Sequence, residues 1–462
     1  RVPRAPGGRA RLALATAAVL LTASERLTFA VAELAEYRPV LVAADTFPAY
    51  MRLHWRRLGD WLGLSRHHDP NLAGLDDEAV RYPLGPIERP AGSRDWNVLW
   101  LVSESLRADA LDAEIMPATW AFAQRATRFE RHFSSGNGTR MGMFGMFYGL
   151  YGNAWFQMLA AIRGPVLMDV LLGAGYDVQA FTSARFTYPE FDRTLFALVP
   201  PERLHEGDPG LPGWRNDRAQ VGALLASLDG REPGRPFFRF MFFESPHAPY
   251  DFPPDAVIRP DYLADLNYVA LDLDDPVEPI RNRYLNACHH LDSQLARVFD
   301  GLQERGLLDS TIVIVTGDHG EEFLERGHWG HNSAFTDEQT RTPLVIHVPG
   351  RPPARVTSMS SHHDLPATLL TLLGVVTPSE RYSLGHDLFG PVERTGCVIS
   401  GWDRMALVDA HFKYVLPYRS GRIAGGEVLD ADDRPIGGST DPPPMNVARV
   451  RSTLADMSRF LR

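Results

Sequence analysis

Short apolar runs recur through the middle of the chain, and each is followed at once by polar residues. Their length and lack of alternation are typical of strands buried on both faces of a sheet. They occupy residues 97–102 (NVLWLV), 176–181, 236–243, 311–316 and 343–348. Amphipathic stretches at 117–126, 280–305 and 364–373 predict helices between them. This order predicts the α/β class, with a mostly parallel central sheet and helices on both faces.

The two ends of the chain depart from this pattern. Residues 12–23 form an apolar run shorter than the ~20 residues that cross a bilayer, which suits a signal-peptide core or the end of a membrane helix. The N-terminal helical segment after it mixes arginine with tyrosine and tryptophan at 50–61, as at a membrane interface or on a solvated helix packed against the main domain. Short strands around 397–400 and 412–416 and a final helix predict a small C-terminal subdomain.

Composition narrows the function classes. The chain has 462 residues and a formal net charge of −10, so we expect no nucleic-acid partner. Lys413 is the only lysine and lies outside any Gly-Lys-Ser/Thr sequence, which excludes a P-loop. Cys288 and Cys397 are expected to be buried small apolar residues, with a single disulfide as the alternative.

Polar residues with metal-binding chemistry follow three of the apolar runs. Glu104 comes after the first, Glu244 and His247 after the third, and Asp318 and His319 after the fourth. One acid after a strand is ordinarily a helix cap or a turn, but parallel strands bring their carboxyl ends to one edge, where binding sites form. Adjacent aspartate and histidine are oxygen and nitrogen ligands that Zn²⁺ or Mn²⁺ accepts. The pattern predicts a divalent ion that activates a hydroxyl and neutralises a phosphoryl or sulfuryl group.

The candidate nucleophile lies in the glycine-rich segment 134–142 (SSGNGTRMG). Thr139 offers an attacking hydroxyl, and Arg140 a guanidinium that can pair with an anion. The alternative is a Gly/Ser turn in which the threonine caps a helix. Of the two histidines at 328 and 331, we expect one to lie near the site.

Several of these segments together resemble one family. NVLWLVSESLRADAL, SSGNGT, ESPHAPY, IVTGDHGEEF and PLVIHVPG are similar to motifs of the alkaline phosphatase/sulfatase superfamily, over roughly residues 95–392. SSGNGTRMGMFGMFYGLYG, QTRTPLVIHVPG and SLGHDLFGP further resemble the inner-membrane, sulfatase-like proteins of the YejM type, which are related to lipoteichoic acid synthases and phosphoethanolamine transferases.

The resemblance implies a location and a division of the chain. The protein would sit in the bacterial inner membrane with its main domain in the periplasm. We therefore expect residues 1–24 to be the end of a truncated membrane helix and 25–94 to be amphipathic helices and a linker. Residues 95–392 would form the sulfatase-like catalytic domain and 393–462 the C-terminal subdomain.

The resemblance also implies a site and a reaction. One divalent ion (Mn, Zn, Mg or Ca) would be held by Glu104, Thr139, Asp318 and His319. Thr139 would attack a phosphate ester of a membrane lipid or glycolipid and form a phospho-threonine, which water or an acceptor hydroxyl resolves. The resemblance assigns His247 and His331 to contacts with the substrate phosphate.

Two alternatives stay open. Sulfatases that use a modified Cys or Ser carry it in a Cys/Ser-x-Pro-x-Arg signature, and neither Cys288 nor Cys397 lies in one, so sulfuric ester hydrolysis is the weaker alternative. The other is a catalytically weak, membrane-anchored sensor that binds lipopolysaccharide-type lipid and regulates a protein partner. The intact set of metal ligands favours catalysis.

Overall fold

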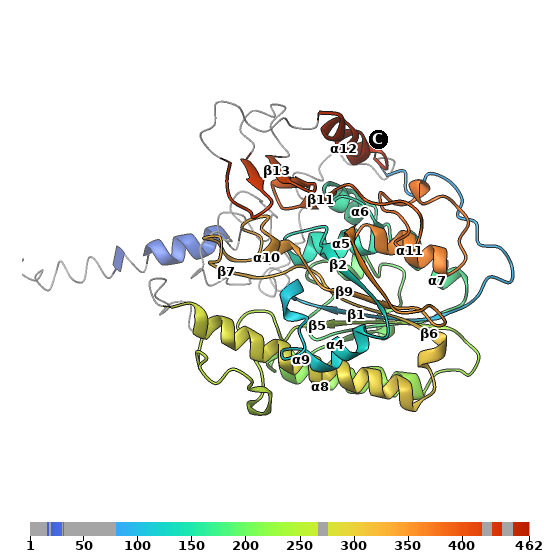
Figure 1. Ribbon diagram of the computed structural model, residues 1–462, viewed down its shortest axis with the longest axis horizontal. Helices are drawn as coiled ribbons and strands as arrows, with labels where there is room; N and C mark the ends of the chain where they lie inside the picture. The colour runs from blue at the N-terminus through green and yellow to red at the C-terminus, as the bar shows by residue number, and fades with distance from the viewer. Residues whose placement is uncertain are drawn as a thin grey trace, which may run out of the picture. The chain divides into compact units, whose positions relative to one another are not determined.

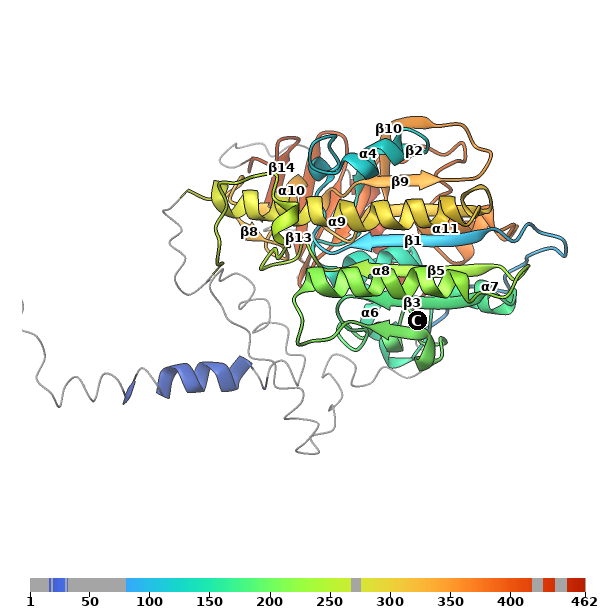
Figure 2. The same cartoon turned by 90° about the horizontal axis from the view of Figure 1, so that it is seen from below.

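The computed structural model describes residues 16–17, 20–29, 31, 80–266, 276–417, 427–436 and 447–461 (Figures 1 and 2). The chain divides into two compact units, residues 1–74 with 267–271, and residues 75–266 with 272–462. In the first, residues 20–29 are helical. None of the helices in the described ranges is long and apolar enough to cross a membrane. The arginine and aromatic segment at 50–61 lies outside the described residues, and the predicted domain boundaries stay predictions.

A central sheet of eight strands organises the second unit. Its order is β10 (Ala354–Ser361), β2 (Thr127–Phe133), β9 (Leu344–His347), β6 (Thr311–Gly317), β1 (Asn97–Ser103), β5 (Phe237–Phe243), β3 (Asp177–Thr182) and β4 (Leu204–Glu206). Strands β6, β1, β5, β3 and β4 are parallel neighbours, whereas β9 runs antiparallel to β6 and to β2. The predicted α/β class and mostly parallel sheet are confirmed.

Helices cover both faces of this sheet, as predicted (Figure 1). One face carries α4, α8 and α9, which contact one another, and the other carries α5, α7 and α11. Their bounds, with those of the remaining helices, are α4 Pro117–Ala123, α5 Thr139–Tyr148, α6 Trp155–Ala160, α7 Val166–Gly173, α8 Gly213–Asp229, α9 Glu278–Glu304, α10 Asp337–Thr340, α11 Asp364–Leu372 and α12 Val447–Ser458. Strands β1, β5 and β6 are almost wholly buried because helices lie on both sides, which explains their continuous apolar sequences.

A smaller antiparallel sheet forms the C-terminal part, with α12 against it. Its strands are β11 (Cys397–Ser400), β12 (Arg404–Val408), β13 (Phe412–Pro417) and β14 (Glu427–Asp430). One apolar cluster joins Cys397, Ile399 and Val415 of this sheet to Phe133 and Phe335 of the main domain. Cys288 and Cys397 are both buried and free, so the single disulfide is wrong.

Candidate active site

Three neighbouring strands deliver the predicted residues to one edge of the sheet. In the parallel register Ser103 of β1 lies beside Phe243 of β5 and Gly317 of β6, so the three strands end together. The backbone N–H of Glu104 donates to Phe243 O at 2.9 Å, and that of Asp318 donates to Ser103 O at 3.1 Å. The strand exits therefore meet, as the sequence predicted.

Thr139 reaches the same place from the other direction. It is the first residue of α5, and its hydroxyl donates to Glu104 Oε1 at 2.7 Å and lies 3.2 Å from His319 Nε2. The hydroxyl does not cap the helix, so the capping alternative is wrong. Close packing fixes this position: a Cβ on Gly142 would lie only 2.2 Å from Asp318 O, and one on Gly138 only 2.0 Å from Asn332 Oδ1.

The Asp318 carboxylate is buried and only half satisfied. Its Oδ1 accepts hydrogen bonds from the backbone N–H groups of Ser105 (3.0 Å) and His319 (2.8 Å). Its Oδ2 has no hydrogen-bond partner and lies 3.3 Å from His319 Nε2. The Nδ1–H of His319 donates to Gly320 O at 2.8 Å, which turns Nε2 toward Thr139 and Glu104. A buried oxygen with no hydrogen-bond partner among the described residues, beside a ring nitrogen that a carboxylate and a hydroxyl share, is typical of a place where a cation binds.

The ionisation of these groups is uneven. Burial opposes the charge on Glu104, but its hydrogen bond to His319 and the nearby charge of His247 lower its pKa to about 2. Burial and the Glu104 charge raise the pKa of Asp318 well above its usual range. Burial disfavours the imidazolium of His319, yet Asp318 and Glu104 outweigh it and raise that pKa to about 9. The two carboxylates therefore share the single imidazolium of His319, a shortage of positive charge that a divalent cation would relieve.

The donor set fits a divalent metal ion. One ligand atom each from Glu104, His319 and His331 lie within 4.8 Å of one another, and the orphaned Asp318 Oδ2 lies beside His319 Nε2. Carboxylate oxygens with imidazole nitrogens suit Zn²⁺, Mn²⁺ and similar ions. His331 thus joins the potential ligands, whereas the resemblance assigned it to the substrate phosphate. Which of these residues bind metal stays a prediction.

The two histidines predicted to contact substrate lie beside this group. The rings of His247 and His331 are 5.6 Å apart, and those of His319 and His331 are 4.3 Å apart. Arg140 is oriented differently: its guanidinium pairs with buried Glu190 at 2.8 Å and lies 4.7 Å from the Trp402 ring. Contact between Arg140 and a substrate anion stays a prediction.

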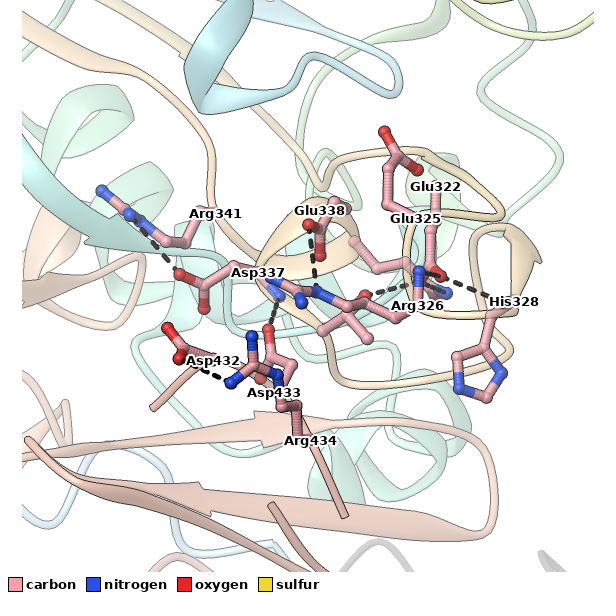
Figure 3. A network of polar contacts seen from close by, with 12 residues as sticks. Glu322, Glu325, Arg326, His328, Asp337, Glu338, Arg341, Asp432, Asp433 and Arg434 are labelled. Carbon is pink, nitrogen blue, oxygen red and sulfur yellow. Dashed lines mark hydrogen bonds and ion pairs between the residues drawn. The ribbon is translucent and has the colours of Figure 1, made fainter. Parts of the chain in front are cut away.

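Two adjacent glutamates that the sequence did not single out lie at the start of a short strand pair, β7 (Glu322–Phe323) and β8 (Trp329–Gly330). Glu321 comes just before β7, and Glu322 is its first residue. Glu321 accepts from His331, whereas Glu322 accepts from the backbone N–H groups of Arg326 and His328 (Figure 3). Glu322 also accepts from Thr336 and Gln339 side chains, so it holds the loop that carries His331. The sequence feature that could have identified them is the Glu-Glu pair directly after Asp-His-Gly. Neighbouring residues of an extended chain point to opposite sides, so one glutamate can face His331 while the other faces the loop that carries it.

Glu244 and Asp217 are a further carboxylate pair near the strand ends that carry Glu104 and Asp318. Asp217 is fully buried and accepts hydrogen bonds from the backbone N–H groups of Glu244 (3.0 Å) and Ser245 (3.1 Å), which fixes the turn before His247. Burial raises the pKa of Glu244 to about 7; His247 lowers it, and the charges of Asp217 and Glu104 raise it. No periodic pattern in α8 singles out Asp217.

A site of this kind, at the carboxyl edge of this sheet, places the molecule among the sulfatase-like esterases and transferases. The Sulfatase family model matches residues 96–375, and the chain belongs to this family. The inner membrane protein YejM of Salmonella typhimurium is 27% identical over 365 residues, which cover 76% of this chain and 55% of the relative. The chain thus spans about half the length of the YejM proteins that it matches. Human iduronate 2-sulfatase is 30% identical over 189 residues, or 33% of this chain and 34% of that enzyme.

Solved structures share the fold. The lipoteichoic acid synthase LtaP from Listeria monocytogenes superposes with a TM-score of 0.59 at 15% identity, covering 81% of this chain and 94% of that one. The phosphonate monoester hydrolase of Agrobacterium radiobacter gives a TM-score of 0.59 at 18% identity, covering 79% and 96%. A protein of the alkaline phosphatase superfamily from Vibrio parahaemolyticus gives 0.60 at 17% identity, covering 90% and 96%. The resemblance to the alkaline phosphatase/sulfatase superfamily and to YejM-type proteins is confirmed.

Proposed function

We propose that this protein is a metal-dependent phosphoric-ester hydrolase or phosphotransferase that acts on envelope lipids or glycolipids through Thr139. The observation that carries the proposal is the Thr139 hydroxyl, 2.7 Å from Glu104 Oε1 and 3.2 Å from His319 Nε2 at the edge of the sheet. Similarity to the YejM proteins, which are named inner membrane proteins, supports a location in the bacterial inner membrane with the main domain in the periplasm.

The residues divide the work as follows. Glu104, Asp318 and His319, with Thr139 or His331, would hold the ion, which lowers the pKa of a hydroxyl and offsets charge on phosphoryl oxygens. Thr139 Oγ1 forms a bond to phosphorus as the bond from phosphorus to the alcohol oxygen breaks. His247 or His331 gives a proton to that leaving oxygen, and the Thr139 hydroxyl loses its own proton to water.

The second half of the reaction breaks down the phospho-threonine and regenerates the free Thr139 hydroxyl. Water attacks the phospho-threonine in hydrolysis, or an acceptor hydroxyl attacks it in transfer, and the bond from phosphorus to Thr139 Oγ1 breaks. The histidine that gave up its proton now accepts one from the attacking hydroxyl, and Thr139 regains its own. The product is free phosphate monoester or a new ester.

Turnover of chromogenic esters tests the proposal. The purified protein is assayed on bis(p-nitrophenyl) phosphate and p-nitrophenyl phosphate with Mn²⁺, Zn²⁺, Mg²⁺ or Ca²⁺. We expect metal-dependent release of p-nitrophenol that Thr139→Ala abolishes and Thr139→Ser, which keeps a hydroxyl, partly retains. Equal rates in wild type and Thr139→Ala would overturn the nucleophile.

A regulatory role is the second candidate, favoured by the 365-residue similarity to inner membrane proteins. In this case the protein binds lipopolysaccharide-type lipid at the membrane and controls a protein partner. Cells that carry Thr139→Ala would then keep the function of wild type. The similarity to human iduronate 2-sulfatase supports sulfuric ester hydrolysis as a third candidate, which predicts sulfate release from an aryl sulfate.

A further inference from the structure

Two buried side chains lie behind His331: Glu321 contacts the Nδ1 of its ring, and Tyr250 contacts Glu321. The Nδ1 of His331 lies 2.7 Å from Glu321 Oε2, and the Tyr250 hydroxyl donates to Glu321 Oε1 at 2.7 Å. Glu321 is 2% exposed and Tyr250 is fully buried. Because a carboxylate accepts hydrogen bonds, the Nδ1 of His331 must carry the proton. Both oxygens of Glu321 are then satisfied, one by the imidazole and one by the phenol.

The backbone of Tyr250 is held in an unusual conformation. Its φ of 57° lies in the left-handed region, which a bulky aromatic residue rarely adopts. Its ring packs edge-on against Tyr284, with centroids 5.8 Å apart, and against Phe323 at 5.5 Å. Strained residues of this kind persist where the surroundings fix them, and they concentrate at functional sites. The hydroxyl of Tyr250 is therefore fixed in place opposite Glu321.

The backbone next to His331 is tied to the nucleophile loop. The N–H of Asn332 donates to Asn137 O at 2.7 Å, two residues before Thr139. A Cβ on Gly138 would lie 2.0 Å from Asn332 Oδ1, so the Asn332 side chain occupies the space that Gly138 leaves by lacking a side chain. His331 is thus anchored through its backbone on one side and through Glu321 on the other.

We propose that Glu321 and Tyr250 are positioning residues that fix the tautomer of His331, so that Nε2 is presented to the metal ion and substrate. A neutral imidazole has one protonated and one free nitrogen, and the partner of the first decides which is free. With Nδ1–H bound to Glu321, Nε2 is the free nitrogen in the group formed with Glu104 and His319. A carboxylate behind a ligating histidine orients the ring and raises its basicity. The kinetic consequence rests on the proposed function, whereas the tautomer does not.

The chain offers matched controls. Glu321→Leu removes the acceptor, whereas Glu321→Gln keeps an amide oxygen that can accept from Nδ1–H. Tyr250→Phe removes one hydroxyl from the aromatic cluster. Tyr284→Phe removes the neighbouring hydroxyl, which donates to Ser105 O at 2.9 Å instead of to Glu321. A change common to both tyrosine variants would reflect altered packing and not the loss of the hydrogen bond from Tyr250 to Glu321.

The test uses the full chain with ¹⁵N-labelled histidine. Long-range ¹H–¹⁵N spectra of the metal-free protein report the tautomer of His331, which is assigned with His331→Gln, and calorimetric titration reports Zn²⁺ affinity. We expect a proton on Nδ1 in wild type, in Glu321→Gln and in Tyr284→Phe. We expect mixed tautomers and about 10- to 100-fold weaker Zn²⁺ binding in Glu321→Leu, and a smaller loss in the same direction in Tyr250→Phe.

Two results would overturn the proposal. One is a wild-type His331 that carries its proton on Nε2. The other is Tyr250→Phe with the spectrum and Zn²⁺ affinity of Tyr284→Phe, a comparison that decides the matter even when Glu321→Leu does not fold. Turnover of bis(p-nitrophenyl) phosphate is measured beside these. A wild type without turnover counts against the proposed function. The tautomer and the Zn²⁺ affinity still test whether Glu321 and Tyr250 position His331.

Discussion

Two regions of buried charge in this molecule are balanced in opposite ways. At the strand-end site, formed by Glu104, Asp318 and His319, the two carboxylates share the imidazole of His319, and among the described residues no arginine or lysine pairs with either carboxylate. Beneath the C-terminal sheet, the only lysine, Lys413, lies 2.6 Å from both Asp337 and Asp433 and is 4% exposed.

The second region is neutral in sum. Arg341 approaches Asp337 at 3.4 Å, and Asp433 also accepts from the backbone N–H of Asp337, as Figure 3 shows around α10. Lys413 further donates to Phe335 O at 2.9 Å. The cluster joins β13 to the main domain and needs nothing more. The strand-end site has two carboxylates for one imidazole, and that deficit of positive charge distinguishes a site that awaits a ligand from a contact that stabilises the fold.

The largest expected effect is on catalysis at the unbalanced site. Glu104→Gln keeps the shape of the side chain but removes a charged ligand and the acceptor of the Thr139 hydroxyl. We expect turnover of a chromogenic diester to fall at least ~1,000-fold, about 4 kcal/mol in the barrier. Circular dichroism checks that the variant is folded. A rate within a few-fold of wild type would mean that the strand-end site does not bind the catalytic ion.

The next effect is on stability at the balanced site. Lys413→Met leaves Asp433 buried without its cation, and we expect the free energy of unfolding in urea to fall by about 3–5 kcal/mol. Adding Asp433→Asn should restore most of this loss, because Asp337 keeps Arg341 as its cationic partner and no buried carboxylate is then left unpaired. A single variant as stable as wild type would show that the cluster is not a structural contact.

A buried histidine pair gives an intermediate effect that depends on pH. Burial, with a charge contribution from His363 for His362 and from Arg394 for His363, lowers the pKa of each to about 3. The unfolded chain binds protons below about pH 6.5 that the folded chain refuses, so stability is present above that pH and is lost as pH falls toward 3. At pH 4.5 each histidine should cost about 2–3 kcal/mol relative to pH 7.5.

Urea unfolding of wild type and His363→Gln at the two pH values measures this. The variant should lose less stability on acidification than wild type does. An equal loss in both would show that His363 is protonated in the folded protein. The His363 side chain does not cap α11 and instead contacts Ser361 Oγ at 3.0 Å.

The smallest effect has the opposite sign. Asp318→Asn removes a buried charge that has to share its one cationic partner, His319, with Glu104, so we expect the metal-free protein to gain about 1–3 kcal/mol of stability at pH 8. The raised pKa of Asp318 means that the wild type loses stability as pH rises above about 4, and asparagine does not. Asp177→Asn is the control, because Asp177 is paired with buried Arg239 and should lose stability. Destabilisation by both variants would contradict the charge deficit.

Much of the fold could be predicted because buried parallel strands have continuous apolar sequences. β1, β5 and β6 were found within a residue of their bounds for this reason. β2 (TRFERHF) escaped because its side chains are alternately covered, and β10 because most of an edge strand is exposed. The apolar run of β9 predicts a strand but not its antiparallel direction, since direction depends on which strands flank it.

The site divides along the same line. Glu104, Asp318 and His319 could be predicted because each follows an apolar strand whose end the sequence marks, and Thr139 because it lies in a glycine-rich segment. The structure brings the four residues together. Partners that depend on tertiary packing could not be predicted. Tyr250 meets Glu321 across 71 positions, and Arg140 meets Glu190 across 50.

The most direct test of the catalytic account is the covalent state of Thr139 during turnover. The protein is mixed with a phosphodiester and metal, quenched in acid, digested and measured by mass spectrometry. We expect a phosphoryl or phosphodiester adduct on Thr139 that requires metal and is absent after chelation. Metal-dependent turnover with Thr139 unmodified, and with the rate unchanged in Thr139→Ala, would contradict the account.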